Sequence, residues 1–144
     1  MACDMRIAAQ NARFGLVFVK RGLHPDMGGS FFLPRIVGTA RACEMIFTGK
    51  IIDADEADRI GLVNRVVPSD KVMEEARLLA EQIAGGPSVA MGMSKISIYQ
   101  ALDSDLNAAL DYEAFAQSIC SQTEDAKEGV LSFLEKRDPV FKGR

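Results

Sequence analysis

The side chains best suited to chemistry gather in one short segment, residues 22–29, whose sequence is GLHPDMGG. It places a carboxylate, Asp26, in a glycine-rich turn just before an expected helix. If Leu23, Met27 and Phe31 withdraw this carboxylate from water, its proton affinity rises and it can act as a general base. A plainer interpretation stays open, because Pro-Asp-x-Gly is also a good turn sequence and Asp26 could simply cap the helix.

Other sequence patterns that carry chemistry are missing. There is no GxxxxGKS/T, GxGxxG or GxSxG motif, so phosphate loops, dinucleotide-binding folds and nucleophile elbows have no support. The three cysteines, Cys3, Cys43 and Cys120, are widely spaced and are accompanied by a single histidine, His24. This set lacks the spacing of a zinc site and cannot form a paired disulfide framework. We therefore expect no metal and no redox cofactor.

Length and charge narrow the class of protein. The chain has 144 residues, about the size of one domain, and its 17 Lys and Arg against 20 Asp and Glu give a net charge of -3. That balance offers no cationic surplus for nucleic acid. No stretch reaches the roughly 20 consecutive apolar residues of a membrane span, and the N-terminus lacks the apolar region of a signal peptide. We therefore expect a cytoplasmic protein without a nucleic-acid or membrane partner.

The expected elements form a single unit in which residues 1–67 supply strands, loops and the Asp26 segment, and residues 68–144 are helical. Apolar runs predict the strands, while Gly, Pro and capping residues mark the helix ends. Strands are expected at 5–8, 14–19 and 62–67. Helices are expected from Ser30 with a break near Gly38, then at 40–47, 54–60, from the Ser69-Asp70 cap to Ile83, and at 88–102, 105–121 and 123–135. This mixture predicts an α/β protein that is mostly helical with a few short strands.

The position of the first strand bears on completeness. It begins within a few residues of Met1 without a nearby hairpin partner, and the few strands make a sheet too small for the helices that follow. We therefore expect the unit to be truncated at its N-terminus.

Several motifs resemble the crotonase superfamily, which contains the enoyl-CoA hydratases and isomerases. They are, in the order of that family, ACDMRIA with ARFG, GLHPDMGG with LPRIVG, FTG, ADEA with GLVN, and the ending EGV with FLEKR. The resemblance covers essentially all 144 residues and is to the C-terminal part of the family. It implies the spiral fold shared by ClpP and crotonase, here its C-terminal part only, and assembly as a homotrimer or a homohexamer.

Two departures from the family pattern bear on the reaction that the resemblance implies. The strand that matches residues 14–18 ends in a catalytic glutamate in the hydratases, whereas this chain has Phe18. The other hydratase glutamate and the oxyanion-hole glycine lie upstream of the segment that matches Ala2. The acid that remains, Asp26, is similar in position to the catalytic aspartate of the phenylacetate-pathway ring-epoxide and Δ3,Δ2-enoyl-CoA isomerases.

A single carboxylate is enough for such an isomerisation. One base takes a proton from Cα and returns it to Cγ, while two N–H donors stabilise the thioester enolate. The expected function is thus isomerisation of an unsaturated acyl-CoA substrate by Asp26, with no cofactor beyond the CoA of the substrate. The residues expected to shape the pocket are Phe18, Leu23, Pro25, Met27, Gly28, Gly29 and Phe31.

Two other interpretations remain open. Asp26 could direct water instead, which would make the protein an acyl-CoA hydratase or hydrolase of the same superfamily. Alternatively, the chain is a truncated and non-catalytic member, because the upstream glycine is absent. The resemblance also makes Phe133 and Lys136 candidates for contact with the CoA nucleotide, although Phe133 equally fits a helix core and Lys136 a solvated helix end.

Overall fold

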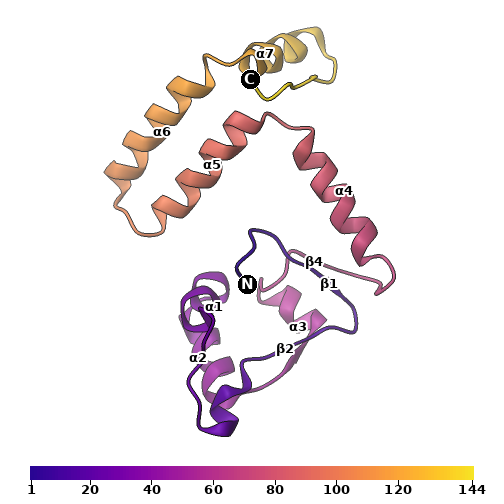
Figure 1. Ribbon diagram of the computed structural model, residues 1–144, viewed down its shortest axis with the longest axis vertical. Helices are drawn as coiled ribbons and strands as arrows, with labels where there is room; N and C mark the ends of the chain where they lie inside the picture. Colours follow the sequence, from indigo (N-terminus) through magenta and orange to yellow (C-terminus); the bar gives the residue numbers. More distant parts are fainter. The chain divides into compact units, whose positions relative to one another are not determined.

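The computed structural model describes all 144 residues, which form two compact units, Met1–Leu78 and Leu79–Arg144 (Figure 1). Helices dominate both, and the strands are two or three residues long. The expected mixture of many helices and few short strands is therefore confirmed. None of the helices combines the length and hydropathy needed to cross a membrane.

The first unit is built from short strands and three helices around one core. Its elements are β1 (Ile7–Ala9), β2 (Arg13–Phe14), α1 (Gly29–Val37), α2 (Thr39–Thr48), β3 (Ile52–Asp53), α3 (Ala54–Arg59) and β4 (Arg65–Val67). β1 lies parallel to β4, and β2 lies antiparallel to β3. In the core, Leu33 of α1 and Met45 of α2 are 0% and 1% exposed. They pack with Leu16, Ile52 and Leu62, so burial of apolar side chains joins segments that are distant in the sequence.

One expected strand is replaced by a 3-10 helix, η1 (Val17–Arg21). The apolar run 14–19 predicts a strand, but only its first residue belongs to β2. η1 packs against α2, and a Cβ on Gly49 at the end of α2 would lie 3.1 Å from Lys20 and 3.3 Å from Val19. This close packing outweighs the β preference of the sequence Val-Phe-Val.

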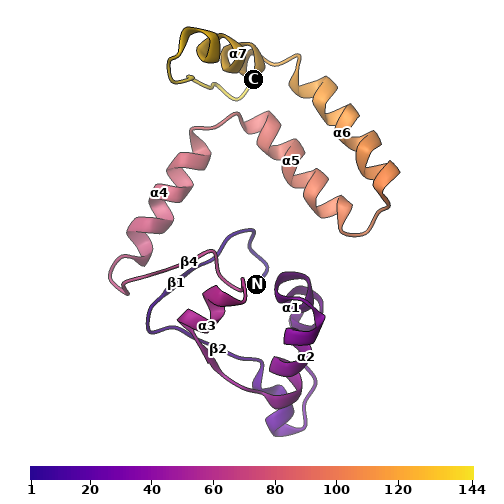
Figure 2. The ribbon, with the colours of Figure 1, turned by 180° about the vertical axis from the view of Figure 1, so that it is seen from behind.

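The second unit is helical. Its elements are the end of α4 (Val72–Ala84), which begins in the first unit, then α5 (Ser88–Ala101), α6 (Leu106–Cys120) and α7 (Glu124–Glu135). α5 and α6 run antiparallel as a hairpin (Figure 2). The side chains of Asp105 and Thr123 accept N–H groups of the first turns of α6 and α7, so these starts lie within a residue or two of the expected ones.

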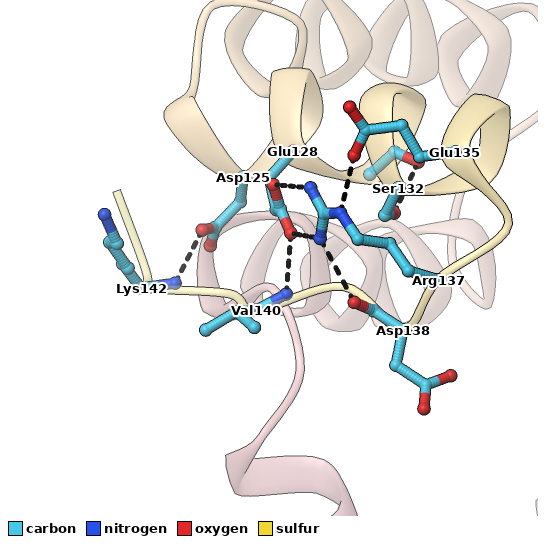
Figure 3. A network of polar contacts seen from close by, with 9 residues as sticks. Asp125, Glu128, Ser132, Glu135, Arg137, Asp138, Val140 and Lys142 are labelled. Atoms are coloured by element: carbon cyan, nitrogen blue, oxygen red, sulfur yellow. Dashed lines mark hydrogen bonds and ion pairs between the residues drawn. The ribbon is translucent and has the colours of Figure 1, made fainter.

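An ion-pair network closes the end of α7 (Figure 3). The Arg137 guanidinium contacts both carboxylate oxygens of Glu128 at 2.6 and 2.9 Å, and its Nε donates to Glu135 at 2.7 Å. The Val140 N–H also donates to Glu128, at 2.9 Å. The Arg137 guanidinium and this N–H together lower the pKa of Glu128 from 4.5 to about 2. The carboxylate form is therefore favoured by folding.

This shift predicts a loss of stability in acid. Because the folded pKa lies below the unfolded one, the contribution of Glu128 is fully present above about pH 4.5 and is lost as the pH falls toward 2. We expect Glu128→Gln to lower the free energy of unfolding at pH 6 and to flatten its decline between pH 4.5 and 2, measured by urea denaturation. The control is Glu124→Gln, whose ion pair with Arg144 is more than half exposed on both sides. An unchanged decline in Glu128→Gln would contradict the assignment.

Candidate functional site

The turn that carries Asp26 is fixed by its backbone. Met27 and Gly28 both adopt left-handed conformations, with φ of 49° and 76°, and the Gly29 N–H donates to the Asp26 carbonyl oxygen at 2.8 Å. A non-glycine residue such as Met27 is uncommon in this region, where it persists only if its surroundings enforce it. The N-cap of α1 is Gly28, without a side-chain hydrogen bond. The interpretation of Asp26 as a helix cap is therefore wrong, whereas the turn that Pro-Asp-x-Gly predicts is present.

Two glycines allow the turn to lie directly against apolar side chains. A Cβ on Gly28 would lie 2.7 Å from the ring of Phe32, and a Cβ on Gly29 would lie 2.6 Å from Cδ2 of Leu16. Gly29 and Pro25 are both buried, and a Cβ added to Gly29 would lie 3.5 Å from the Cβ of Pro25. The start of α1 thus rests on the core, and Asp26 is held beside it.

Gly28→Ala is expected to destabilise the first unit by about 1–3 kcal/mol, because it combines a positive φ with a clash against Phe32. The measurement is thermal or urea denaturation. Gly61→Ala is the matched control, since Gly61 has a φ of 75° but nothing within 4 Å of an added Cβ. It isolates the backbone penalty, and equal losses in the two variants would contradict a role for the Phe32 contact.

The desolvation expected for Asp26 is not provided by this chain. Asp26 is exposed, and the apolar side chains expected to cover it are exposed as well: Leu23 by 59%, Met27 by 94% and Phe31 by 48%. The Phe31 ring instead carries the Arg35 guanidinium, 3.7 Å from its centroid, and meets Phe32 edge to face. These side chains therefore line an open surface around Asp26 and do not form a closed pocket.

Phe18 is linked to this turn through the backbone. It lies in η1, is half-buried and packs against the core of the first unit. Its carbonyl oxygen accepts the N–H of Leu23 at 3.1 Å, which ties η1 to the segment leading to Asp26. The side chain at position 18, beside the turn, is thus apolar. Asp26 is the one acidic residue in the GLHPDMGG segment.

An open cavity of about 560 Å³ lies elsewhere in the first unit. It is lined mainly by apolar side chains of the N-terminal segment and the core, among them Phe14, Leu16, Leu33 and Met45. None of the residues expected to form the substrate pocket lines it. The sequence analysis did not predict this cavity, and the apolar residue Leu16 beside Gly15 was the one sequence feature that pointed to it. In the structure, Leu16 lines the cavity and also lies against Gly29 of the Asp26 turn.

The two residues expected to contact the nucleotide belong to the second unit. Phe133 is 81% exposed on α7, and Lys136 ends that helix in a left-handed conformation with φ of 54°. Phe133 is therefore not part of a helix core. His24, near Asp26, is exposed, and no group of His, Cys, Asp or Glu side chains is arranged to hold a metal ion.

Comparison with known proteins places this geometry in context. The family model described as "Enoyl-CoA hydratase/isomerase" matches residues 1–144. A short-chain-enoyl-CoA hydratase of Clostridioides difficile is 47% identical over 133 residues, which are 92% of this chain and 86% of that protein. A crotonyl-CoA hydratase of Syntrophomonas wolfei is 42% identical over 141 residues, which are 98% of this chain and 54% of that protein.

Solved structures agree with the sequence comparison. The crystal structure of an enoyl-CoA hydratase from Bacillus anthracis matches 99% of this chain with a TM-score of 0.94 and 40% sequence identity. The match covers 55% of that protein, so the chain spans about half the length of most of these relatives. The assignment of this half to the C-terminal part of the family stays a prediction from the motifs.

Proposed function

Because the chain belongs to the enoyl-CoA hydratase/isomerase family, we propose that it forms part of an enzyme that adds water to a 2-enoyl-CoA thioester, with Asp26 as its acid and base. The observation that carries the proposal is the placement of Asp26, an exposed carboxylate that caps no helix in a turn fixed by Met27, Gly28 and Gly29. The names of the relatives favour hydration over the isomerisation expected from the sequence.

The proposed mechanism uses one carboxylate twice. The Asp26 carboxylate accepts a proton from water as the water oxygen bonds to Cβ, and the electron pair of the double bond moves to the thioester as an enolate. The same group then returns a proton to Cα, which gives the 3-hydroxyacyl thioester. The enolate oxygen needs N–H donors, whose removal typically costs about 2.7–4 kcal/mol each. From the resemblance to the crotonase superfamily, we expect these donors in the part of the longer relatives that this chain does not span.

Isomerisation is the second candidate, and Phe18 is the observation that favours it. The half-buried ring occupies the position where the resemblance places a hydratase glutamate. An apolar side chain there keeps water away from the acyl group, so that a proton taken from Cα returns to Cγ. Under this alternative Asp26 keeps the same place and carries the proton between the two carbons.

Product analysis in labelled water separates the two reactions. The full chain is incubated with crotonyl-CoA and with a 3-enoyl-CoA in H₂¹⁸O, and the products are identified by mass spectrometry. Labelled 3-hydroxyacyl-CoA from crotonyl-CoA supports hydration. Conversion of the 3-enoyl to the 2-enoyl thioester without label supports isomerisation. The absence of turnover with both substrates would favour the non-catalytic interpretation of this chain, because the enolate would then lack its N–H donors.

The assembly state belongs to the same proposal. The second unit exposes large apolar side chains, including Leu106 at 72%, Phe115 at 54% and Leu134 at 70%. Apolar surfaces of this kind typically mark contacts between proteins. We infer that the chain associates with itself, and the resemblance to the crotonase superfamily makes a homotrimer or a homohexamer the expected form, to be measured by native mass spectrometry. A monomer at micromolar concentration would contradict this inference.

A further inference from the structure

The residues that follow α7 fold back along that helix as a strap, residues 138–144. Val140 and Phe141 lie at Glu128 and Gly129 of the helix, and the later residues lie nearer its start: Lys142 and Gly143 meet Asp125, and Arg144 meets Glu124. The strap is therefore antiparallel to α7 and is anchored at nearly every residue. Figure 3 shows its Val140 and Lys142 N–H groups directed at the carboxylates of the helix.

Asp125 makes the central contact of the strap. Its side chain is buried, with only 3% of the residue exposed, and its two carboxylate oxygens accept the N–H groups of Lys142 and Gly143 at 2.7 and 2.8 Å. Its own N–H, in the first turn of α7, donates to the main-chain oxygen of Arg144 at 3.1 Å. The Asp125 side chain thus accepts two N–H groups of the strap. The Asp125 N–H, which has no partner within the first turn of α7, donates to the strap in return.

The end of the strap lies against the start of another helix. A Cβ on Gly143 would be 2.8 Å from Oγ and 3.8 Å from Cβ of Ser88, the first residue of α5. Both ribbon views draw the C-terminus beside this end of α5 (Figures 1 and 2). Residues 140–144 of the strap therefore lie against the first half of α7, and Gly143 also lies against the start of α5.

Direct packing of α7 on its neighbours is sparse. α5 and α6 pack closely on each other, whereas α7 has no comparable contact with either helix. An open groove of about 640 Å³ separates the end of α6 from the apolar side of α7, and Val130 and Leu134 in it are 64% and 70% exposed. Helix packing alone does not fix α7, and the strap supplies the missing connection.

We propose that residues 138–144 are a positioning strap, locked by Asp125, that fixes α7 to the start of α5 within the second unit. This inference is independent of the proposed reaction. It assigns to a buried carboxylate outside the candidate active site the task of joining the last helix to the hairpin.

A disulfide trap tests the proposal in the full chain. The 3.8 Å between the Ser88 Cβ and an added Gly143 Cβ matches the mean separation in disulfides, about 3.8 Å. Ser88→Cys with Gly143→Cys is expected to form one intramolecular bond under mild oxidation, identified by peptide mass spectrometry. Adding Asp125→Ala is expected to slow bond formation by about tenfold or more, because the freed strap lowers the effective concentration of the two thiols.

Controls separate strap release from loss of fold. Gly143→Cys alone reports crosslinks to the native cysteines. Glu113→Gln, which changes an exposed glutamate of α6, is expected to crosslink at the parental rate in the double-cysteine chain. Asp125→Asn keeps the size and one acceptor oxygen, so it decides the result if Asp125→Ala loses its helical circular dichroism. A slower rate in Asp125→Asn supports the strap. Failure of the parent to crosslink, or parental rates in both Asp125 variants, would overturn it.

Discussion

Asp26→Asn is expected to lower turnover of the 2-enoyl-CoA or 3-enoyl-CoA substrate by about 10²–10⁴-fold, the usual contribution of a positioned acid or base. Asparagine keeps the size of the side chain but cannot accept and return a proton. Because Asp26 is exposed and does not cap α1, the substitution should leave the melting temperature within about 1 °C of the parent. Loss of rate with an unchanged fold is the signature of a catalytic group.

The matched control is Asp58→Asn, which neutralises another exposed aspartate of the first unit. Both variants change the net charge equally, so a general electrostatic effect on the anionic substrate would appear in both. The measurement is kcat and KM for each substrate. Full activity in Asp26→Asn would remove Asp26 from the mechanism under both proposed reactions, whereas an equal fall of KM in the two variants would indicate charge alone, because each variant removes one negative charge that repels the anionic substrate.

The helices were largely predictable from the sequence because their ends carry local signals. Asp53 and Thr123 cap α3 and α7 through hydrogen bonds to N–H groups three residues later, as their types and positions predict. η1 was not predictable in this way. Its Val-Phe-Val sequence prefers a strand locally, and the deciding interaction is the fit of Val19 and Lys20 against Gly49, some thirty residues away. Local propensity contains no information about that contact.

The candidate site was also predictable only in part. The glycines of GLHPDMGG correctly indicate a special turn, since their roles depend on backbone conformation and close approach at residues 28 and 29. The environment of Asp26 was not predictable, because apolar neighbours in sequence do not define what covers a side chain. Met27 is adjacent to Asp26 yet is 94% exposed, while the buried contacts of the turn come from Leu16 and Phe32. Sequence therefore located the carboxylate but not its surroundings.

The largest loss of stability is expected from Leu33→Ala, at about 2–5 kcal/mol. Leu33 is 0% exposed at the centre of the first unit and lines the same cavity as Leu16 and Met45. The substitution removes the apolar contacts of the Leu33 isobutyl group from a core that already adjoins a cavity. The neighbouring side chains therefore do not fill the new space, and the lost contacts are not replaced. A loss of this size is a large part of the 5–15 kcal/mol that typically stabilises a domain.

Urea denaturation measures this effect, and Met73→Ala is the control, because Met73 of the first unit is 64% exposed and should change stability by less than about 0.5 kcal/mol. Leu33 also belongs to α1, whose first residue Gly29 rests on Leu16 beside the Asp26 turn. At a temperature where Leu33→Ala remains folded, we therefore expect kcat to fall modestly while its pH dependence stays that of the parent. Asp26→Asn, by contrast, should lower kcat by about 10²–10⁴-fold. Similar unfolding energies for Leu33→Ala and Met73→Ala would show that Leu33 is not the core contact described here.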